Sequence, residues 1–284
     1  MKKAIIVPNP NKDTDLRVTS DIVKRLGELG IKSLIDRKYE SPQLTDVEYF
    51  NDNLIGADII VVVGGDGSVI DASCLALSLD IPLLGINLGK VGYLTQLDPS
   101  NLSMLERLRS GVYQVDGKML LTVEKQTAIG ATRCERLAVN DVVVSHENYL
   151  GISSFMIESE HGDHVMYRAD AVIASTPAGS TAYSFSAGGP VISHTLDSIT
   201  LTPVCPHSFF NRAIVYGPNE RILISNAGES VLNISVDGRY FDSIAKSEGC
   251  AVYMSNKRLK MITFTESNVF TVLSKKINHL GDMV

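Results

Sequence analysis

The chain has 284 residues, 44% of them hydrophobic, and a formal net charge of −6. This size allows one large domain or two modest ones, and the acidic balance excludes binding to nucleic acid through bulk charge. Four widely spaced cysteines form no CxxC pair, which argues against a zinc cluster or a disulfide framework. No apolar run approaches the roughly 20 residues that cross a membrane, and the first one is too short for a signal peptide. We therefore expect a cytoplasmic protein without membrane or nucleic-acid partners.

Strand and helix signals alternate in the first third of the chain. An apolar run at 4–7 precedes helical spacing over 16–29, which Gly30 ends. Further elements are predicted as strands at 31–35, 59–63 and 81–86, a helix at 69–79 and a connecting helix at 101–109. This alternation predicts an α/β domain with a parallel sheet, which we place at residues 1–100.

After about residue 117 the signals become those of short strands. They are predicted at 119–124, 137–144, 153–158, 164–168, 221–225, 231–236 and 250–254, separated by Gly, Asn and Asp. Many short strands at close spacing predict a β-rich antiparallel domain, which we place at residues 101–284. The last ~20 residues are candidates to pack back on the first domain.

The sequence Gly-Gly-Asp-Gly-Ser at 64–68 follows directly on the predicted strand 59–63. Ligands of open α/β sheets bind at the carboxyl ends of strands, and the N-terminus of a following helix favours an anion. Glycines permit positive φ and leave backbone amides open to a phosphate. A carboxylate beside phosphate needs a further role, so Asp66 would activate a hydroxyl or hold a metal. The alternative is that Asp66 or Ser68 caps the helix at 69–79.

The sequence GGDGS resembles a signature shared by NAD kinases, lipid kinases of the diacylglycerol and sphingosine type, and phosphofructokinases. Alone it indicates phosphoryl transfer but not the acceptor. Further segments resemble NAD kinase motifs in the same order: LGKVGYLTQ (88–96), LAVNDVVV (137–144), STPAGSTAYSFSAGGP (175–190), LTPVCPHSF (201–209) and SVDG (235–238). From about Val61 to Gly238 the chain therefore resembles a bacterial NAD kinase.

This resemblance implies transfer of the ATP γ-phosphoryl group to the adenosine 2′-hydroxyl of NAD. Asp66 would act as the base, with Gly65, Gly67 and Ser68 beside the phosphates. Mg²⁺ is implied as the cofactor that accompanies nucleotide phosphates, without a protein cage for a metal. The resemblance also implies a homo-oligomer, either a tetramer or a dimer.

Asn140 and Asp141 interrupt the apolar strand predicted at 137–144. A polar pair there lowers stability unless its groups are satisfied. One explanation is a turn or bulge. The resemblance implies instead that both residues grip the ribose and adenine of NAD, although Asp141 stands where the family usually has Glu.

The resemblance implies that further residues bind nucleotide. They are Tyr93, Arg168, Asp170, Thr181, Ala182, Tyr183, Ser186 and Asp237. Simpler explanations stay open for some of them: Tyr183 could be a core aromatic, and Asp237 could be only a hairpin-turn residue. The segment 175–186 could likewise be only a loop rich in small residues.

Two other functions stay open at this point. A lipid or sugar kinase would share GGDG, but a lipid kinase leaves the TPAGSTAY run unexplained. Phosphofructokinases have a glycine-rich turn near the N-terminus, where this chain has Val7-Pro8-Asn9-Pro10. A pyridine-nucleotide sensor without catalytic activity would have no need of Asp66.

Overall fold

The computed structural model describes residues 1–51, 56–89, 92–127, 130–147 and 151–264. The chain divides into two compact units, one of residues 1–117 with the segment from Leu259 onward, the other of residues 118–258. Residues 101–117, which we expected in the second domain, lie in the first unit because Leu105 and Leu108 are buried in its core. The prediction that the last ~20 residues pack back on the first domain concerns residues 265–284, which lie outside the described residues.

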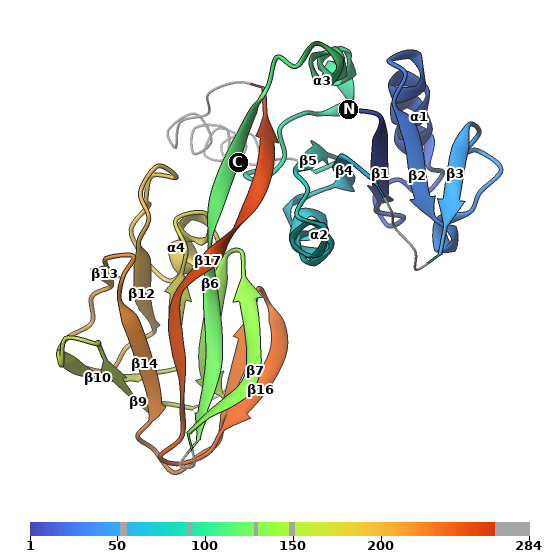
Figure 1. Ribbon diagram of the computed structural model, residues 1–284. Coiled ribbons are helices and arrows are strands. Elements are labelled where there is room, and N and C mark those ends of the chain that lie inside the picture. Colours follow the sequence, from blue (N-terminus) through green and yellow to red (C-terminus); the bar gives the residue numbers. More distant parts are fainter. Residues whose placement is uncertain (52–55, 90–91, 128–129, 148–150, 265–284) are drawn as a thin grey trace, which may run out of the picture. The chain divides into compact units, whose positions relative to one another are not determined.

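The first unit is built on a parallel sheet with the strand order β5-β4-β1-β2-β3 (Figure 1). Its strands are β1 (Lys3–Pro8), β2 (Lys32–Asp36), β3 (Val47–Phe50), β4 (Ile59–Gly64) and β5 (Leu83–Asn87). β4 is buried along its whole length. This agrees with its continuous β-branched sequence, which is typical of a strand covered on both faces.

Helices lie between and after these strands. They are α1 (Arg17–Glu28), η1 (Arg37–Tyr39), α2 (Asp66–Leu79), η2 (Pro99–Leu105) and α3 (Glu106–Ser110). The apolar side of α1 packs on the face of the sheet that carries Ile6, Ile35 and Val61. α2 begins earlier than the predicted helix at 69–79, so the aspartate of GGDG is its first residue. The connecting helix predicted at 101–109 is a 3-10 helix followed by a short α-helix.

The second unit contains two antiparallel sheets (Figure 1). One contains β7 (Gly130–Ala138), β9 (Ser153–Glu158), β10 (His164–Ala169), β14 (Arg221–Asn226) and the larger parts of β6 (Gln114–Thr127) and β17 (Gly249–Thr263). The end of β17 belongs to the first unit, where Met261 pairs in parallel with Leu83 of β5. The other sheet has the order β13-β12-β11-β8-β15-β16, with β8 (Asp141–His146), β11 (Ala171–Ser175), β12 (Ile199–Val204), β13 (Ile214–Tyr216), β15 (Leu232–Val236) and β16 (Arg239–Ile244). Side chains of both sheets form one hydrophobic core, as in a β-sandwich.

These observations confirm the predicted fold class, a parallel α/β unit followed by an antiparallel β-rich one. The prediction of one strand over 137–144 is wrong. β7 ends at Ala138, β8 begins at Asp141, and the two strands belong to different sheets. The chain bends at Val139 and Asn140 because it passes there from one sheet to the other. No helix in the described ranges is long and apolar enough to span a membrane.

Candidate active site

The carboxylate of Asp66 joins two segments of the first unit. Its Oδ2 accepts a hydrogen bond from the backbone N–H of Tyr93 at 2.9 Å, and its Oδ1 accepts one from the N–H of Leu94 at 2.9 Å. α2 has no side-chain hydrogen bond at its N-cap, Gly65. Asp66 therefore does not cap the helix. It holds the segment that follows β5 against the N-terminus of α2.

Backbone conformation does not require the three glycines of this turn, and lack of space for a side chain applies to Gly64 and Gly65 but not to Gly67. None of Gly64, Gly65 and Gly67 has a positive φ, so the expectation that they supply one is wrong. A Cβ on Gly64 would lie 2.3 Å from Ser68 Oγ, and around Gly67 a Cβ would meet nothing within 4 Å. Ser68 does not cap α2 either, because its Oγ accepts a hydrogen bond from Asn9 Nδ2 at 2.8 Å.

In the second unit the carboxylate of Asp237 organises the bend between β7 and β8. It accepts hydrogen bonds from the backbone N–H groups of Val139 (2.9 Å), Asn140 (2.7 Å) and Asp141 (3.1 Å). Asp237 has a φ of 48°, a left-handed conformation that aspartate tolerates better than most residues. It is thus more than a hairpin-turn residue, because it fixes the two polar residues that interrupt the predicted strand.

A pocket of ≈ 480 Å³ opens beside this bend. Its lining residues are Asn140, Asp141, Val143, Ser145, Ala171, Ala182, Tyr183, Ser235, Asp237 and Gly238. Alternate residues of a strand share one face, so Asp141, Val143 and Ser145 face the pocket while Val142 and Val144 belong to the core. The pocket therefore lies on the outer face of the second sheet, where β8 pairs with β11 and β15.

Five of the predicted site residues meet in this pocket: Asn140, Asp141, Ala182, Tyr183 and Asp237. The residues that the sequence analysis missed are Val143, Ser145, Ala171, Ser235 and Gly238. Because side chains alternate along a strand, Val143 and Ser145 could have been predicted to share the face of Asp141. The other three lie on neighbouring strands or a turn, and their approach depends on strand pairing.

The segment after β11 packs closely on the bend. It forms η3 (Gly179–Thr181) and α4 (Tyr183–Ser186). A Cβ on Gly179 would lie 2.0 Å from the carbonyl oxygen of Asn140, so only glycine fits there. Thr176 Oγ1 donates a hydrogen bond to the carbonyl of Val139 at 2.7 Å. Gly179 and Thr176 thus hold this segment against the bend that lines the pocket.

The remaining predicted residues lie elsewhere. Thr181 is buried and donates a hydrogen bond to the carbonyl of Ala178 at 3.2 Å, Ser186 is exposed at the end of α4, and Arg168 is exposed on β10. Asp170 follows β10, and its charge contributes to a raised pKa of Tyr183, after burial and the charges of Cys205 and Asp141. The exposure of Tyr183 rules out a core position for its ring. Gly65, Asp66, Gly67, Ser68 and Tyr93 belong to the first unit.

Two carboxyl groups face the pocket and share its electrostatics. Asp141 is only 5% exposed, and burial, followed by the charge of Asp237, raises its pKa to about 7. Burial also raises the pKa of Asp237, although three backbone N–H groups oppose that shift. Hydrogen bonds to a carboxylate favour its charged form, so we assign the negative charge to Asp237 and, below about pH 7, the proton to Asp141.

The pocket can therefore recognise a neutral polar group better than an anion. A protonated Asp141 can donate a hydrogen bond, and the Asn140 carboxamide can both donate and accept. No hydrogen bond of the Asn140 carboxamide is found within the described part of the chain. Sugar hydroxyls and a purine edge match these groups, whereas a phosphate would be repelled by the carboxylate of Asp237.

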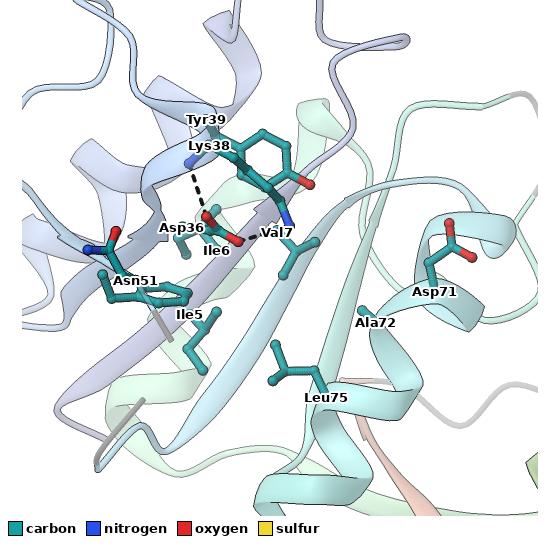
Figure 2. Close-up of a pocket in the computed structure, with 11 residues that line it drawn as sticks. Ile5, Ile6, Val7, Asp36, Lys38, Tyr39, Asn51, Asp71, Ala72 and Leu75 are labelled. Atoms are coloured by element: carbon teal, nitrogen blue, oxygen red, sulfur yellow. Dashed lines mark hydrogen bonds and ion pairs between the residues drawn. The ribbon is translucent and has the colours of Figure 1, made fainter. Parts of the chain in front are cut away.

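A second pocket, of ≈ 420 Å³, lies in the first unit. Its lining residues are Ile5, Ile6, Val7, Asp36, Lys38, Tyr39, Phe50, Asn51, Asp71, Ala72 and Leu75. Figure 2 shows the Lys38 ammonium directed at the Asp36 carboxylate, with which it forms an ion pair of 2.9 Å. None of the predicted site residues is among these lining residues.

Comparisons with known proteins find matches over most of the chain. Family models described as the ATP-NAD kinase N-terminal and C-terminal domains match residues 4–111 and 139–264. The chain is 32% identical over 288 residues to a NAD kinase of Caldanaerobacter subterraneus subsp. tengcongensis, covering 98% of this chain and 99% of that protein. It is 33% identical over 281 residues to a NAD kinase of Clostridium beijerinckii, covering 96% and 94%.

Two solved structures share the fold. A yeast NADH kinase complexed with NADH matches with a TM-score of 0.84 at 19% identity, covering 98% of this chain and 88% of that one. A NAD kinase from Archaeoglobus fulgidus in complex with ATP matches with a TM-score of 0.72 at 24% identity, covering 96% and 99%.

Proposed function

Because the chain belongs to the ATP-NAD kinase family, we propose that it transfers the γ-phosphoryl group of ATP to the adenosine 2′-hydroxyl of NAD. The products are NADP and ADP. The observation that carries this proposal is the pocket in which Asn140, Asp141 and Asp237 converge. Its polar groups suit the ribose and base of a nucleoside. The yeast relative was solved with NADH and the archaeal one with ATP.

The proposed reaction uses the groups of the GGDG turn. The 2′-hydroxyl oxygen forms a bond to the γ-phosphorus, the bond from that phosphorus to the β-γ bridging oxygen breaks, and ADP leaves. Asp66 accepts the hydroxyl proton as a general base. Its carboxylate is held by the N–H groups of Tyr93 and Leu94, so its orientation is fixed before substrate binds.

Mg²⁺ is the divalent ion that we propose to accompany ATP, where it would neutralise charge on the phosphate oxygens. Within the described residues there is no group of three or more His, Cys, Asp or Glu side chains that could hold a metal. Phosphate oxygens and water would supply the ligands of this ion, without a cage of protein side chains. The cytoplasmic location expected from the sequence is part of the same proposal.

A coupled assay tests the function. The purified protein is incubated with ATP, Mg²⁺ and either NAD or NADH, and the product is detected with a dehydrogenase specific for NADP. We expect product that depends on both ATP and a pyridine nucleotide. Binding of NAD without any product would favour a sensor. Phosphorylation of a diacylglycerol in place of NAD would favour a lipid kinase.

Asn140→Ala should raise KM for NAD by roughly 10- to 100-fold and leave KM for ATP unchanged. The reason is that loss of the carboxamide leaves polar groups of the bound nucleoside unpaired, at about 1–3 kcal/mol. The melting temperature should stay constant, because no hydrogen bond of this side chain is found within the described ranges. Asn219→Ala, at an exposed asparagine between β13 and β14, is the matched control. Equal increases in both Michaelis constants would contradict the assignment.

We also propose that the protein is a homo-oligomer, a tetramer or a dimer. Phe209, Phe210 and Leu196 of the second unit are exposed apolar side chains, and β10, β13 and β16 lie at sheet edges that a neighbouring subunit could cover. Light scattering should give a mass above one chain, and Phe209→Asp should lower it. A fully active monomer at assay concentration would contradict this proposal.

A further inference from the structure

Lys12 lies in the loop between β1 and α1, and its ammonium reaches the glycine turn at the end of β4. A Cβ built on Gly65 would lie 2.6 Å from Lys12 Nζ, and one built on Gly89 would lie 3.4 Å from it. Gly65 precedes Asp66 at the start of α2, and Gly89 follows β5. The ammonium therefore lies where the turns after two adjacent parallel strands approach each other.

A side chain at position 65 would compete with the Lys12 ammonium for the same space. Its φ of −117° and ψ of −168° are ordinary extended values, which any residue can adopt. Conformation therefore does not require glycine at this position. The Lys12 ammonium occupies the space that a side chain at position 65 would take.

The loop that carries Lys12 is fixed on both sides. The backbone N–H of Asn9 donates to the carbonyl of Val63 at 2.9 Å, and its side chain donates to Ser68 Oγ at 2.8 Å. Asp13 is 3% exposed, and its carboxylate accepts the N–H of Thr19 at 2.8 Å in the first turn of α1. The backbone of Lys12 is thus held before any ligand binds.

The charge of Lys12 is available to a ligand. Lys12 is exposed and forms no ion pair within the described ranges, whereas Lys38 and Lys260 of the same unit are paired with Asp36 and Asp80. The backbone N–H groups at 65–67 are likewise without a hydrogen-bond acceptor there, as expected at a helix N-terminus. A cation beside open N–H groups is the arrangement that binds phosphate.

We propose that the Lys12 ammonium binds the phosphate chain of the phosphoryl donor at the glycine turn. This inference rests on the proposed function and assigns the triphosphate to the first unit. It also explains how a phosphate can approach the turn despite the carboxylate of Asp66, because a positive charge over the adjacent Gly65 offsets the repulsion. The same charge would stabilise the negative charge that moves to the leaving ADP.

Substitution of Lys12 tests this proposal directly. Lys12→Met should raise KM for ATP by about 10- to 100-fold, the loss expected for one charge-assisted hydrogen bond, and should lower kcat. KM for NAD should stay within about twofold. Lys12→Arg should restore most of the ATP affinity, because it keeps the charge. Lys24→Met, at an exposed lysine on α1, is the matched control and should match wild type.

Gly65→Ala supplies an independent test. The new Cβ must displace the ammonium, and a flexible lysine can move away without unfolding the turn. The variant should therefore raise KM for ATP when Lys12 is present and have a much smaller effect in a Lys12→Met background. Fully additive effects in the double variant would mean that Gly65 and Lys12 act separately, and this would overturn the proposal.

Direct binding separates this inference from the proposed function. Calorimetry with tripolyphosphate and Mg²⁺ should show weaker binding to Lys12→Met than to wild type by the same factor as KM for ATP. If wild type makes no NADP but this difference persists, the proposed function is wrong and the phosphate site stands. If wild type makes NADP and Lys12→Met matches it in binding, KM and melting temperature, the inference is wrong.

Discussion

Asp66→Asn should lower kcat by about 10²–10⁴-fold, the usual contribution of a general base. Asparagine has nearly the shape of aspartate but cannot accept a proton from the 2′-hydroxyl of NAD. KM for NAD should change little, because the residues proposed to bind its nucleoside lie in the other unit. The measurement is a comparison of kcat and KM between wild type and variant over a pH series.

The structure adds a cost in stability to this prediction. Both carboxylate oxygens of Asp66 accept backbone N–H groups, from Tyr93 and Leu94. An asparagine retains one acceptor and turns an N–H₂ group toward the other N–H. The free energy of unfolding should therefore fall by about 1–3 kcal/mol. Leu108→Ala is the control, because it removes a buried side chain of the same unit at about 2–5 kcal/mol and should keep full kcat at a temperature where it is folded.

Three outcomes distinguish the roles open to Asp66. If Asp66 is the general base, the decrease of kcat at acidic pH in the wild type should be absent in Asp66→Asn. A residue that only positions the segment around Tyr93 would lower kcat without changing the profile, and this would contradict the base assignment. If Asp66 mainly holds Mg²⁺, a raised Mg²⁺ concentration should restore much of the rate, and the base assignment would again be wrong.

The parts of the site that sequence predicted were those encoded within one short segment. The β-branched run of β4 and the glycines after it predicted a buried strand followed by a turn that carries a carboxylate, and α2 begins at that carboxylate. Asn140 and Asp141 stood out because polar residues interrupted an apolar run, and both line the pocket. Local sequence was enough because burial and periodicity act over a few residues.

The parts that escaped prediction depend on contacts between distant segments. Asp237 was named from the resemblance of the SVDG segment, but its hydrogen bonds to the bend at Val139 and Asn140, almost a hundred positions earlier in the chain, were not predicted. The break at Val139 reflects a passage between two sheets, which alternation along one strand cannot reveal. Lys12 belongs to the glycine turn only because β1 pairs with β4, and in sequence it is one charged residue among several in a loop.

The free energy of unfolding of Asp141→Asn, taken relative to wild type, should be roughly 2–4 kcal/mol higher at pH 8 than at pH 4.5. The pKa of Asp141 is raised from 3.8 to about 7 in the folded protein, first by burial and then by the charge of Asp237. Between pH about 4 and about 7 the folded state keeps a proton that the unfolded chain has released. Wild-type stability therefore falls as pH rises through this window and levels off above it.

Asparagine removes this dependence, because it has no charge to bury at any pH and keeps nearly the same volume. Urea unfolding of wild type and variant at pH 4.5, 6 and 8 measures the difference, and the other titrating groups cancel in the comparison. In an Asp237→Asn background, one of the two causes of the raised pKa of Asp141 is absent. The pH range over which stability falls should therefore end at a lower pH. A difference between wild type and Asp141→Asn that stays constant from pH 4.5 to 8 would mean that Asp141 is ionised in the folded state throughout. The pocket would then hold two negative charges, and its recognition of NAD would have to rest on Asn140 rather than on a proton donated by Asp141.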